Sequence, residues 1–183
     1  MNRIVFLGPT LRRGMAEHLC DAEFHPPAAM GDIARAASRR PEAIVVIDGI
    51  FEDRPSVWHK EILWALSRDV PVIGASSMGA LRAAELDAYG MLGWGKIYAA
   101  YASGELGDDD EVAVVHGPAE MGHMALSDAM VDIRDTVATA RAGGVVTGAE
   151  AEAIISNAKA RHFKERSLLE SVRAVLSISR ATN

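Results

Sequence analysis

Short apolar runs that alternate with helix-like segments are the feature that most restricts how this chain can fold. The clearest runs are residues 4–7, 44–47 and 70–73, each followed directly by Gly or Asp, and a weaker one is residues 22–25, followed by Pro. Runs of this kind are typical of strands buried on both faces. Because helix-like segments separate them, the pattern predicts a parallel sheet covered by helices.

The pattern changes after about residue 123. Residues 112–115 are one more strand candidate, and everything beyond residue 124 is helical in pattern. Thr147 and Glu150 have the spacing of a capping box at the start of one of these helices. We therefore predict an α/β domain over residues 1–123, a Rossmann-like parallel sheet of about four to five strands, and a helical C-terminal extension over residues 124–183.

Composition excludes several classes of protein. The chain has 19 Lys and Arg against 25 Asp and Glu, a formal charge of −6, so nucleic acid is not expected as a partner. The single cysteine, Cys20, excludes a disulfide framework and a cysteine-rich zinc site. No apolar run approaches the ~20 residues that cross a bilayer, and the first run is too short for a signal peptide. We expect no membrane association and a cytoplasmic location.

The ends of the predicted strands are where a ligand is expected. In open parallel sheets, ligands bind beyond the carboxyl ends of the strands. This rule places Thr10, Asp48, Ser76 and Ser77 along one edge. We assign Ser76 and the loop Gly8–Pro9–Thr10 to substrate or anion binding.

The segment Ala75–Ser76–Ser77–Met78–Gly79 approximates the nucleophile elbow G-x-S-x-G, with Ala75 in the place of the first glycine. A sharp turn from strand to helix would present the Ser77 hydroxyl as a nucleophile. The Met78 N–H would then donate to an oxyanion at the start of the following helix. Two alternatives remain at this point, an anion-binding turn and a plain serine cap.

The helix predicted over residues 57–66, with Ser56 as its N-cap, is apolar almost all round. His59 and Glu61 therefore project into apolar surroundings, where each needs a partner. In a catalytic interpretation His59 is the general base for Ser77, oriented by Glu61 or Asp48. In a structural interpretation His59 is a core histidine and Glu61 belongs to an ion pair.

Two further groups of polar residues have competing interpretations. Arg82 shares a helix face with Glu85, so it either holds an anionic substrate or pairs with Glu85. The acidic turn of residues 108–111 precedes His116 and His123 but shows no recognised ligand spacing, so we expect a solvated turn and no metal. His116 is a second candidate for the general base.

Together these motifs resemble the TfuA-like family, over roughly residues 3 to 120. The segments that carry the resemblance are Phe6–Leu7–Gly8–Pro9–Thr10, Pro26–Pro27–Ala28, Gly31–Asp32, Ile47–Asp48–Gly49–Ile50–Phe51, Val57–Trp58–His59–Lys60–Glu61–Ile62, Gly74–Ala75–Ser76–Ser77–Met78–Gly79–Ala80–Leu81–Arg82–Ala83–Ala84–Glu85–Leu86 and Asp109–Asp110–Glu111–Val112–Ala113–Val114.

The resemblance implies a role beside a YcaO protein in making backbone thioamides in peptides. The YcaO protein would activate the amide oxygen with ATP and Mg²⁺, so no cofactor is expected on this chain. The TfuA-like protein would bring sulfur from a ThiS-like carrier that ends in a thiocarboxylate. The precursor peptide and a second copy of the chain are further candidate partners.

Three functions follow from these observations. In the first, Ser77 attacks the thiocarboxylate carbon, His59 takes the proton, and Arg82 or Lys60 neutralises the substrate, whose tail enters a slot between the strand-edge loops. In the second, the chain is a non-catalytic adaptor that docks on YcaO. In the third, it is a nucleotide-binding module, which ranks last because neither G-x-G-x-x-G nor a P-loop is present.

Overall fold

The computed structural model of the chain describes residues 2–51 and 54–181. The chain forms two compact units. The first, the sheet unit, comprises residues 1–109 and 116–124. The second, the helical unit, comprises residues 110–115 and 125–183.

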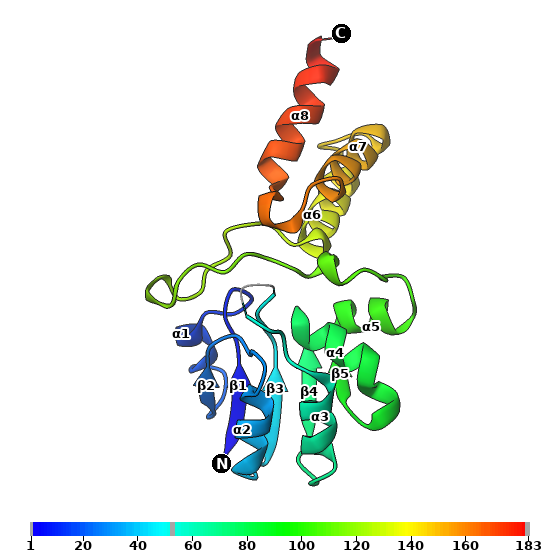
Figure 1. Cartoon of the computed structure of the whole chain (residues 1–183). Coiled ribbons are helices and arrows are strands. Elements are labelled where there is room, and N and C mark those ends of the chain that lie inside the picture. Colours follow the sequence, from blue (N-terminus) through cyan, green and yellow to red (C-terminus); the bar gives the residue numbers. More distant parts are fainter. Residues whose placement is uncertain (1, 52–53, 182–183) are drawn as a thin grey trace. The chain divides into compact units, whose positions relative to one another are not determined.

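Five parallel strands form the sheet unit's centre, which confirms the predicted α/β class (Figure 1). Their order is β2-β1-β3-β4-β5. The direction of winding therefore reverses between β1 and β3, which is where the ligand crevice of doubly wound folds lies. The strands are β1 (Arg3–Phe6), β2 (Glu23–His25), β3 (Ala43–Val46), β4 (Val72–Ala75) and β5 (Leu92–Trp94).

Helices connect these strands in sequence. They are α1 (Arg13–Ala16), α2 (Asp32–Ser38), α3 (His59–Leu66), α4 (Met78–Leu86) and α5 (Lys96–Ala102), with short 3₁₀ turns at η1 (Asp87–Tyr89) and η3 (Ala119–Met121). The predicted N-cap of α3 is wrong. The helix begins at His59, and the Ser56 hydroxyl instead donates to the carbonyl oxygen of Ile50 at 2.9 Å.

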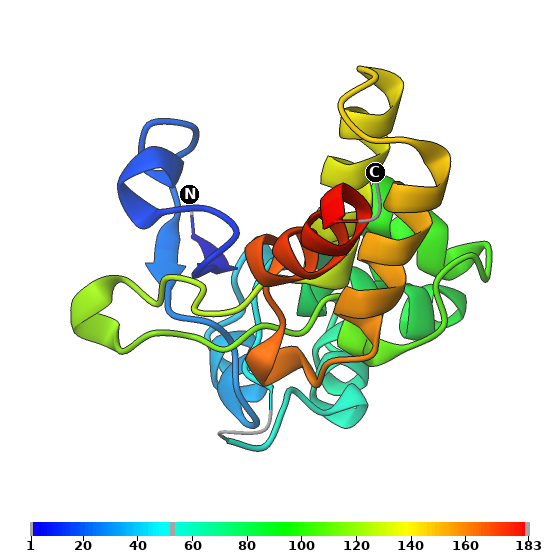
Figure 2. The same cartoon turned by 90° about the horizontal axis from the view of Figure 1, so that it is seen from above.

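Alternate side chains of the strands enter two separate cores. Ile4 and Phe6 of β1 join the main core, which also contains buried side chains of α2 and α3. Val5, between them, belongs to a smaller cluster on the opposite face together with Ala16 of α1. Helices α1 and α2 accordingly lie on opposite sides of the strands (Figure 2). Strands buried on both faces explain why the sequence shows continuous apolar runs.

Two glycines allow α4 to approach the sheet closely. A Cβ on Gly79 would lie 1.7 Å from the carbonyl oxygen of Val46, and one on Gly74 would lie 2.0 Å from the carbonyl oxygen of Gly79. The Gly79 N–H also donates to the carbonyl oxygen of Ile47 at 3.2 Å. The first turn of α4 is thereby fixed against the ends of β3 and β4.

The fifth strand is not the one expected from the sequence. β5 has only three residues, and Leu92 and Trp94 are 56% and 77% exposed, so no apolar run marks it. Gly93 lies between them, facing the ring of Tyr98 in α5. The predicted strand at residues 112–115 is absent, and that segment follows the 3₁₀ turn η2 (Asp109–Glu111) as irregular, buried chain.

The helical unit consists of α6 (Met130–Ala142), α7 (Gly148–Lys159), η4 (Phe163–Glu165) and α8 (Leu168–Ala181). Its core is formed by α6 and α7, with Leu168, Val172 and Val175 of α8 packed against it. The predicted capping box is confirmed, since the Thr147 hydroxyl accepts the Glu150 N–H at 3.2 Å and the Glu150 carboxylate accepts the Thr147 N–H at 2.8 Å.

A buried ion cluster holds the segment 110–115 to these helices. The fully buried Arg166 donates to the carbonyl oxygen of Asp110 at 2.8 Å and to its carboxylate at 2.6 Å. Arg134 donates to both oxygens of Glu111 at 2.9 Å, and Lys159 contacts both carboxylates. Burial raises the pKa of Asp110 and of Glu111, but the bonds from these cations outweigh it and leave both values below normal.

The solvated turn predicted for residues 108–111 is therefore wrong for Asp110 and Glu111. Their carboxylates are internal partners for three basic side chains from α6, α7 and the segment before α8. Sequence spacing gives no sign of this, because the partners lie 23 to 56 residues further along the chain.

Replacing Arg166 should destabilise the helical unit. In Arg166→Met the Asp110 carboxylate and three backbone carbonyls each lose one donor, and removing one partner of a buried pair typically costs ~3 kcal/mol or more. Urea denaturation followed by circular dichroism measures the loss. Arg173→Met is the matched control, because Arg173 is 66% exposed and pairs with Glu170 at the surface, where such a pair is worth ~1 kcal/mol at most. Equal effects of the two substitutions would contradict the assignment.

Candidate functional site

The carboxyl ends of the strands gather the polar residues predicted for the site. Asp48 follows β3, and Ser76 and Ser77 follow β4, as expected. The loop of residues 8–10 follows β1 at the neighbouring position. One residue that the sequence analysis did not select, Lys96, follows β5 at the same edge.

Asp48 is a fully buried carboxylate that organises the loop after β1. One of its oxygens accepts the N–H groups of Gly8 at 2.7 Å and Thr10 at 3.2 Å. The other accepts the Thr10 hydroxyl at 2.7 Å. Burial raises the pKa of Asp48, and the hydrogen bonds from Thr10 and Gly8 act in the opposite direction.

The loop predicted to bind an anionic substrate is hydrogen-bonded to an internal carboxylate. The donors of Gly8 and Thr10 are directed at Asp48, and Pro9 between them has no N–H to offer. In doubly wound folds this is the place where a ligand phosphate meets backbone N–H groups. The internal carboxylate therefore takes the position that a nucleotide phosphate would use, which weighs against the nucleotide-binding alternative.

The turn between β4 and α4 has the local geometry of a nucleophile elbow. Ser76 has φ +60°, a left-handed conformation that a non-glycine residue adopts at a cost in energy. Ser77 precedes the first turn of α4, is partly exposed, and its side chain makes no capping bond to that helix. The plain-cap alternative is therefore not what the structure shows. The N–H of Met78 belongs to the first turn of α4, in which the next two N–H groups, of Gly79 and Ala80, donate to the carbonyl oxygens of Ile47 and Ser77.

The strained position is Ser76 and not Ser77. The sequence motif centres on Ser77, whereas a nucleophile elbow strains the backbone at the nucleophile itself. Both hydroxyls are partly exposed at the end of β4. The turn therefore offers two candidate nucleophiles, and substitution can separate them because glycine is free to adopt φ +60°.

His59 is paired with Glu85 and not with the carboxylates expected. Its Nε2 lies 2.8 Å from Glu85 Oε2, and Arg82 donates to the same oxygen at 2.6 Å. Arg82 also donates through Nε to the carbonyl oxygen of Val57 at 3.1 Å. Of the two interpretations of Arg82, a contact with an anionic substrate or a pair with Glu85, the structure shows the pair with Glu85. Ser77 and Glu85 are eight residues apart along α4, a rise of about 12 Å, so His59 is held about two turns beyond the serine.

Glu61 has a structural role in these contacts. Its carboxylate accepts the N–H of Gly31 at 2.8 Å and of Ala34 at 3.3 Å, both at the start of α2, and the N–H of Trp58 at 3.1 Å. One buried carboxylate therefore satisfies the N-terminal donors of two helices, α2 and α3. Neither Glu61 nor Asp48 contacts His59 among the described hydrogen bonds, which corrects the expected orienting pair.

Lys96 follows β5, the strand that neighbours β4 in the sheet. β4 and β5 are parallel, with Ala75 opposite Trp94. The strand pairing ends there. Ser76 and Ser77 follow Ala75, and Gly95 and Lys96, the first residue of α5, follow Trp94. Motif analysis missed this residue because β5 itself gave no strand signal.

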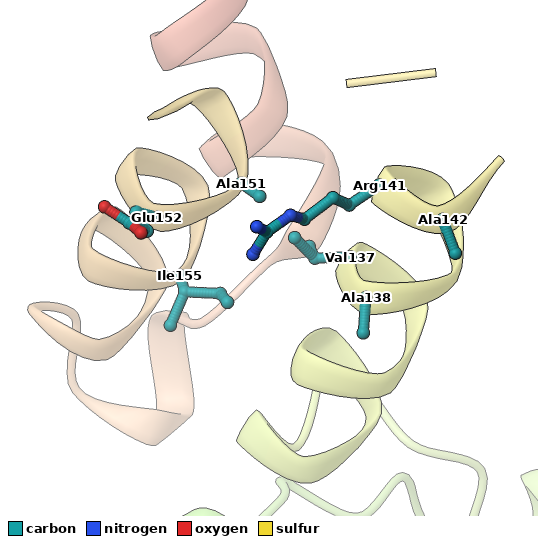
Figure 3. Close-up of a pocket in the computed structure, with 7 residues that line it drawn as sticks. All are labelled: Val137, Ala138, Arg141, Ala142, Ala151, Glu152 and Ile155. Atoms are coloured by element: carbon teal, nitrogen blue, oxygen red, sulfur yellow. The ribbon is translucent and has the colours of Figure 1, made fainter. Parts of the chain in front are cut away.

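Two pockets are described, one in each unit. A pocket of about 530 Å³ lies in the sheet unit, between the residues that follow β2 and the segment 116–123, and His116 forms part of its wall. A pocket of about 440 Å³ lies between α6 and α7, where Arg141 reaches from α6 toward α7 over apolar neighbours (Figure 3). None of the polar residues of the serine turn belongs to either pocket.

The comparison with protein families shows which family the chain belongs to. The model of the TfuA-like protein family matches residues 48–167, about two thirds of the chain. The chain belongs to the TfuA-like family. The match begins at Asp48, later than the resemblance described above, and it continues through α6 and α7 of the helical unit, whereas α8 lies beyond it.

Membership of the TfuA-like family associates the chain with YcaO proteins and with thioamide formation in peptides. No curated protein matches the sequence. Within the described residues, every helix is too short or too polar to cross a membrane.

Asp48→Asn tests whether Asp48 is structural or catalytic. We expect the variant to fold, because an amide oxygen can accept the two N–H groups and the Thr10 hydroxyl can turn to accept the amide N–H. Since burial raises the pKa of Asp48 above 3.8, its contribution to stability is largest below that pH and declines as the pH rises through the folded-state value. The unfolding free energy of the wild type minus that of Asp48→Asn should therefore fall as the pH rises from below 3.8 toward neutral pH.

Urea denaturation across this pH range measures the difference. A difference that is constant or rises with pH would contradict the sign of the pKa shift. Asp48→Ala is the comparison variant, and it should be less stable than Asp48→Asn by about 1–3 kcal/mol because it leaves buried N–H groups without an acceptor.

Proposed function

We propose that this TfuA-like protein supplies sulfur to its YcaO partner by hydrolysing the C-terminal thiocarboxylate of a ThiS-like carrier. The observation that carries the proposal is the Ser76–Ser77 turn. It combines a strained backbone, a partly exposed hydroxyl and the N-terminus of α4 at the ligand-binding edge of a parallel sheet.

The reaction proceeds as acyl transfer to a serine. The Ser77 oxygen attacks the thiocarboxylate carbon, while the Met78 N–H and the positive end of α4 stabilise the oxyanion. The C–S bond then breaks, and the sulfur leaves as hydrosulfide with the proton that came from the serine. Water hydrolyses the resulting ester, which regenerates the hydroxyl and releases the carrier as a carboxylate.

Lys96, which follows the strand next to β4, is the candidate base at this edge. A lysine next to a serine activates the nucleophile in several families of acyl-transfer enzyme. In its neutral form Lys96 would accept the Ser77 proton and pass it to the departing sulfur. His59, the base expected from the sequence, is held by Glu85 further along α4, and Arg82 shares that carboxylate. Arg82 is thus already neutralised, and Lys60 remains an exposed cation on α3.

The nucleophile is tested by two serine substitutions. We expect Ser77→Ala to lower the rate of sulfide release from a thiocarboxylated carrier by at least about 10³-fold, because the acyl-enzyme cannot form. Ser76→Gly is the matched control, since it removes the other hydroxyl and relieves the strain at φ +60°. Sulfide is quantified with purified carrier and without YcaO. If Ser76→Gly alone loses activity, the nucleophile is Ser76. If both variants keep their sulfide-releasing activity, the reaction does not use a serine nucleophile.

The base is tested by comparing Lys96→Met with His59→Gln. General-base catalysis contributes about 10²–10⁴-fold, so we expect a loss of that size in Lys96→Met and less than about threefold in His59→Gln. Thermal unfolding of both variants checks that the fold is intact. A larger loss of rate in His59→Gln than in Lys96→Met would indicate that His59 is the base.

The adaptor alternative is favoured by one specific observation. Leu92 and Trp94 lie on the same face of β5, opposite the α5 side, and are 56% and 77% exposed. Met121 and Met124 are also about half exposed. Exposed apolar groups of this kind mark interaction surfaces. Under this alternative, Ser77→Ala supports full thioamidation by YcaO, whereas Trp94→Ser does not.

A further inference from the structure

The pocket of about 530 Å³ in the sheet unit lies apart from the serine turn and has the character of a small-molecule site. Its volume falls within the range of about 300–1,000 Å³ typical of ligand sites, which combine apolar walls with a few converging polar groups. The apolar part includes Phe6, Pro26, Pro27 and Ile50. It adjoins the carboxyl ends of β1 and β2, on the ligand-binding edge of the sheet.

The polar groups of this pocket are mainly donors. His25, Arg54, His116 and His123 line it, and Asp32 is the only acidic lining residue among those described. The Asp32 carboxylate accepts the Ala29 N–H at 2.8 Å and pairs with Arg35, so its charge is balanced within α2.

The imidazole of His25 is held in a fixed position. Its Nε2 lies 2.7 Å from Glu23, and its ring stacks at 5.3 Å on Phe6. Glu23 is shared with Arg39, and bonds from Arg39 and His25 lower the pKa of this carboxyl to about 2. The negative charge beside His25 is therefore already matched by Arg39. Arg54 lies at the pocket wall as its one arginine among the described lining residues.

The backbone strain at His123 is a second, independent indication of a ligand site. It has φ +54°, directly after Gly122 at φ +66°, so the loop holds a non-glycine residue in the left-handed region at the pocket wall. Strained residues of this kind concentrate at ligand-binding sites, where the surrounding structure maintains them.

We infer that this pocket binds a small anionic ligand, an apolar ring or chain that carries a single carboxylate or phosphate, with Arg54 and His123 as donors to the oxyanion and His25 as part of the wall. The loop after β1 cannot serve this purpose, because its N–H groups are directed at Asp48. The ligand's apolar body packs on Phe6 and the two prolines, and its oxyanion faces the basic residues. The site is separate from Ser77, and the inference does not depend on the hydrolase chemistry.

The test is a binding titration of the full chain with phenyl phosphate, with benzoate and with neutral benzyl alcohol, followed by NMR of the histidine ring protons. We expect saturable shifts of His25 and His123 with at least one of the two anions, and no shift of His18 or His162. Comparison of phenyl phosphate with benzoate shows whether phosphate or carboxylate is preferred. Benzyl alcohol should bind at least about tenfold more weakly than the preferred anion, since it lacks the charge.

Variants locate the site. Arg54→Gln and His123→Asn should each weaken the binding of the preferred anion about tenfold, and asparagine is chosen because it tolerates positive φ. His18→Gln, an exposed histidine of the same unit, and Ser77→Ala should bind as the wild type does. The inference is overturned if neither anion saturates, if benzyl alcohol binds equally well, or if the pocket variants bind like His18→Gln. Loss of binding in Ser77→Ala would also overturn it, by placing the anion at the serine turn.

Discussion

The first turn of α4 rests directly on the backbone of β3 and β4, and the candidate site depends on this contact. Gly74 and Gly79 lie where any Cβ would overlap a carbonyl group, so helix and sheet approach as closely as backbones can. The chain has only two residues, Ser76 and Ser77, in which to turn from strand to helix. The left-handed conformation of Ser76 is the consequence, and it leaves both hydroxyls and the first N–H groups of α4 at the carboxyl edge of the sheet.

Two buried carboxylates, Asp48 and Glu61, accept hydrogen bonds from backbone N–H groups of the loops around that edge. Asp48 takes the N–H groups that a phosphate ligand would need, and Glu61 takes the N-terminal donors of α2 and α3. An unsatisfied buried donor costs about 1–3 kcal/mol, so these carboxylates fix the loops on which the site is built. The proposed chemistry is assigned to other groups at this edge, the serine turn and Lys96, while basic residues near β2 line a separate pocket.

The sequence predicted the parts of this arrangement that depend on neighbouring residues. The runs at residues 4–7, 44–47 and 70–73 mark β1, β3 and β4, and the capping box at Thr147 marks the start of α7. It missed β5, because a three-residue edge strand with exposed Leu92 and Trp94 has no apolar run. The apolar run at residues 112–115 led to a wrong strand prediction, because its side chains are buried although the segment is irregular chain.

By itself the sequence determined the fold class, the position of the serine turn and the membership of the TfuA-like family, because strand and helix periodicity and motif spacing are local properties. Only the tertiary structure decided which charged group meets which partner. His59 meets Glu85 across 26 residues, Asp48 meets Thr10 across 38, and Arg166 meets Asp110 across 56. Hydrogen bonds and ion pairs act over about 3–4 Å, and the packing of separate elements, not their order along the chain, brings two groups within that distance.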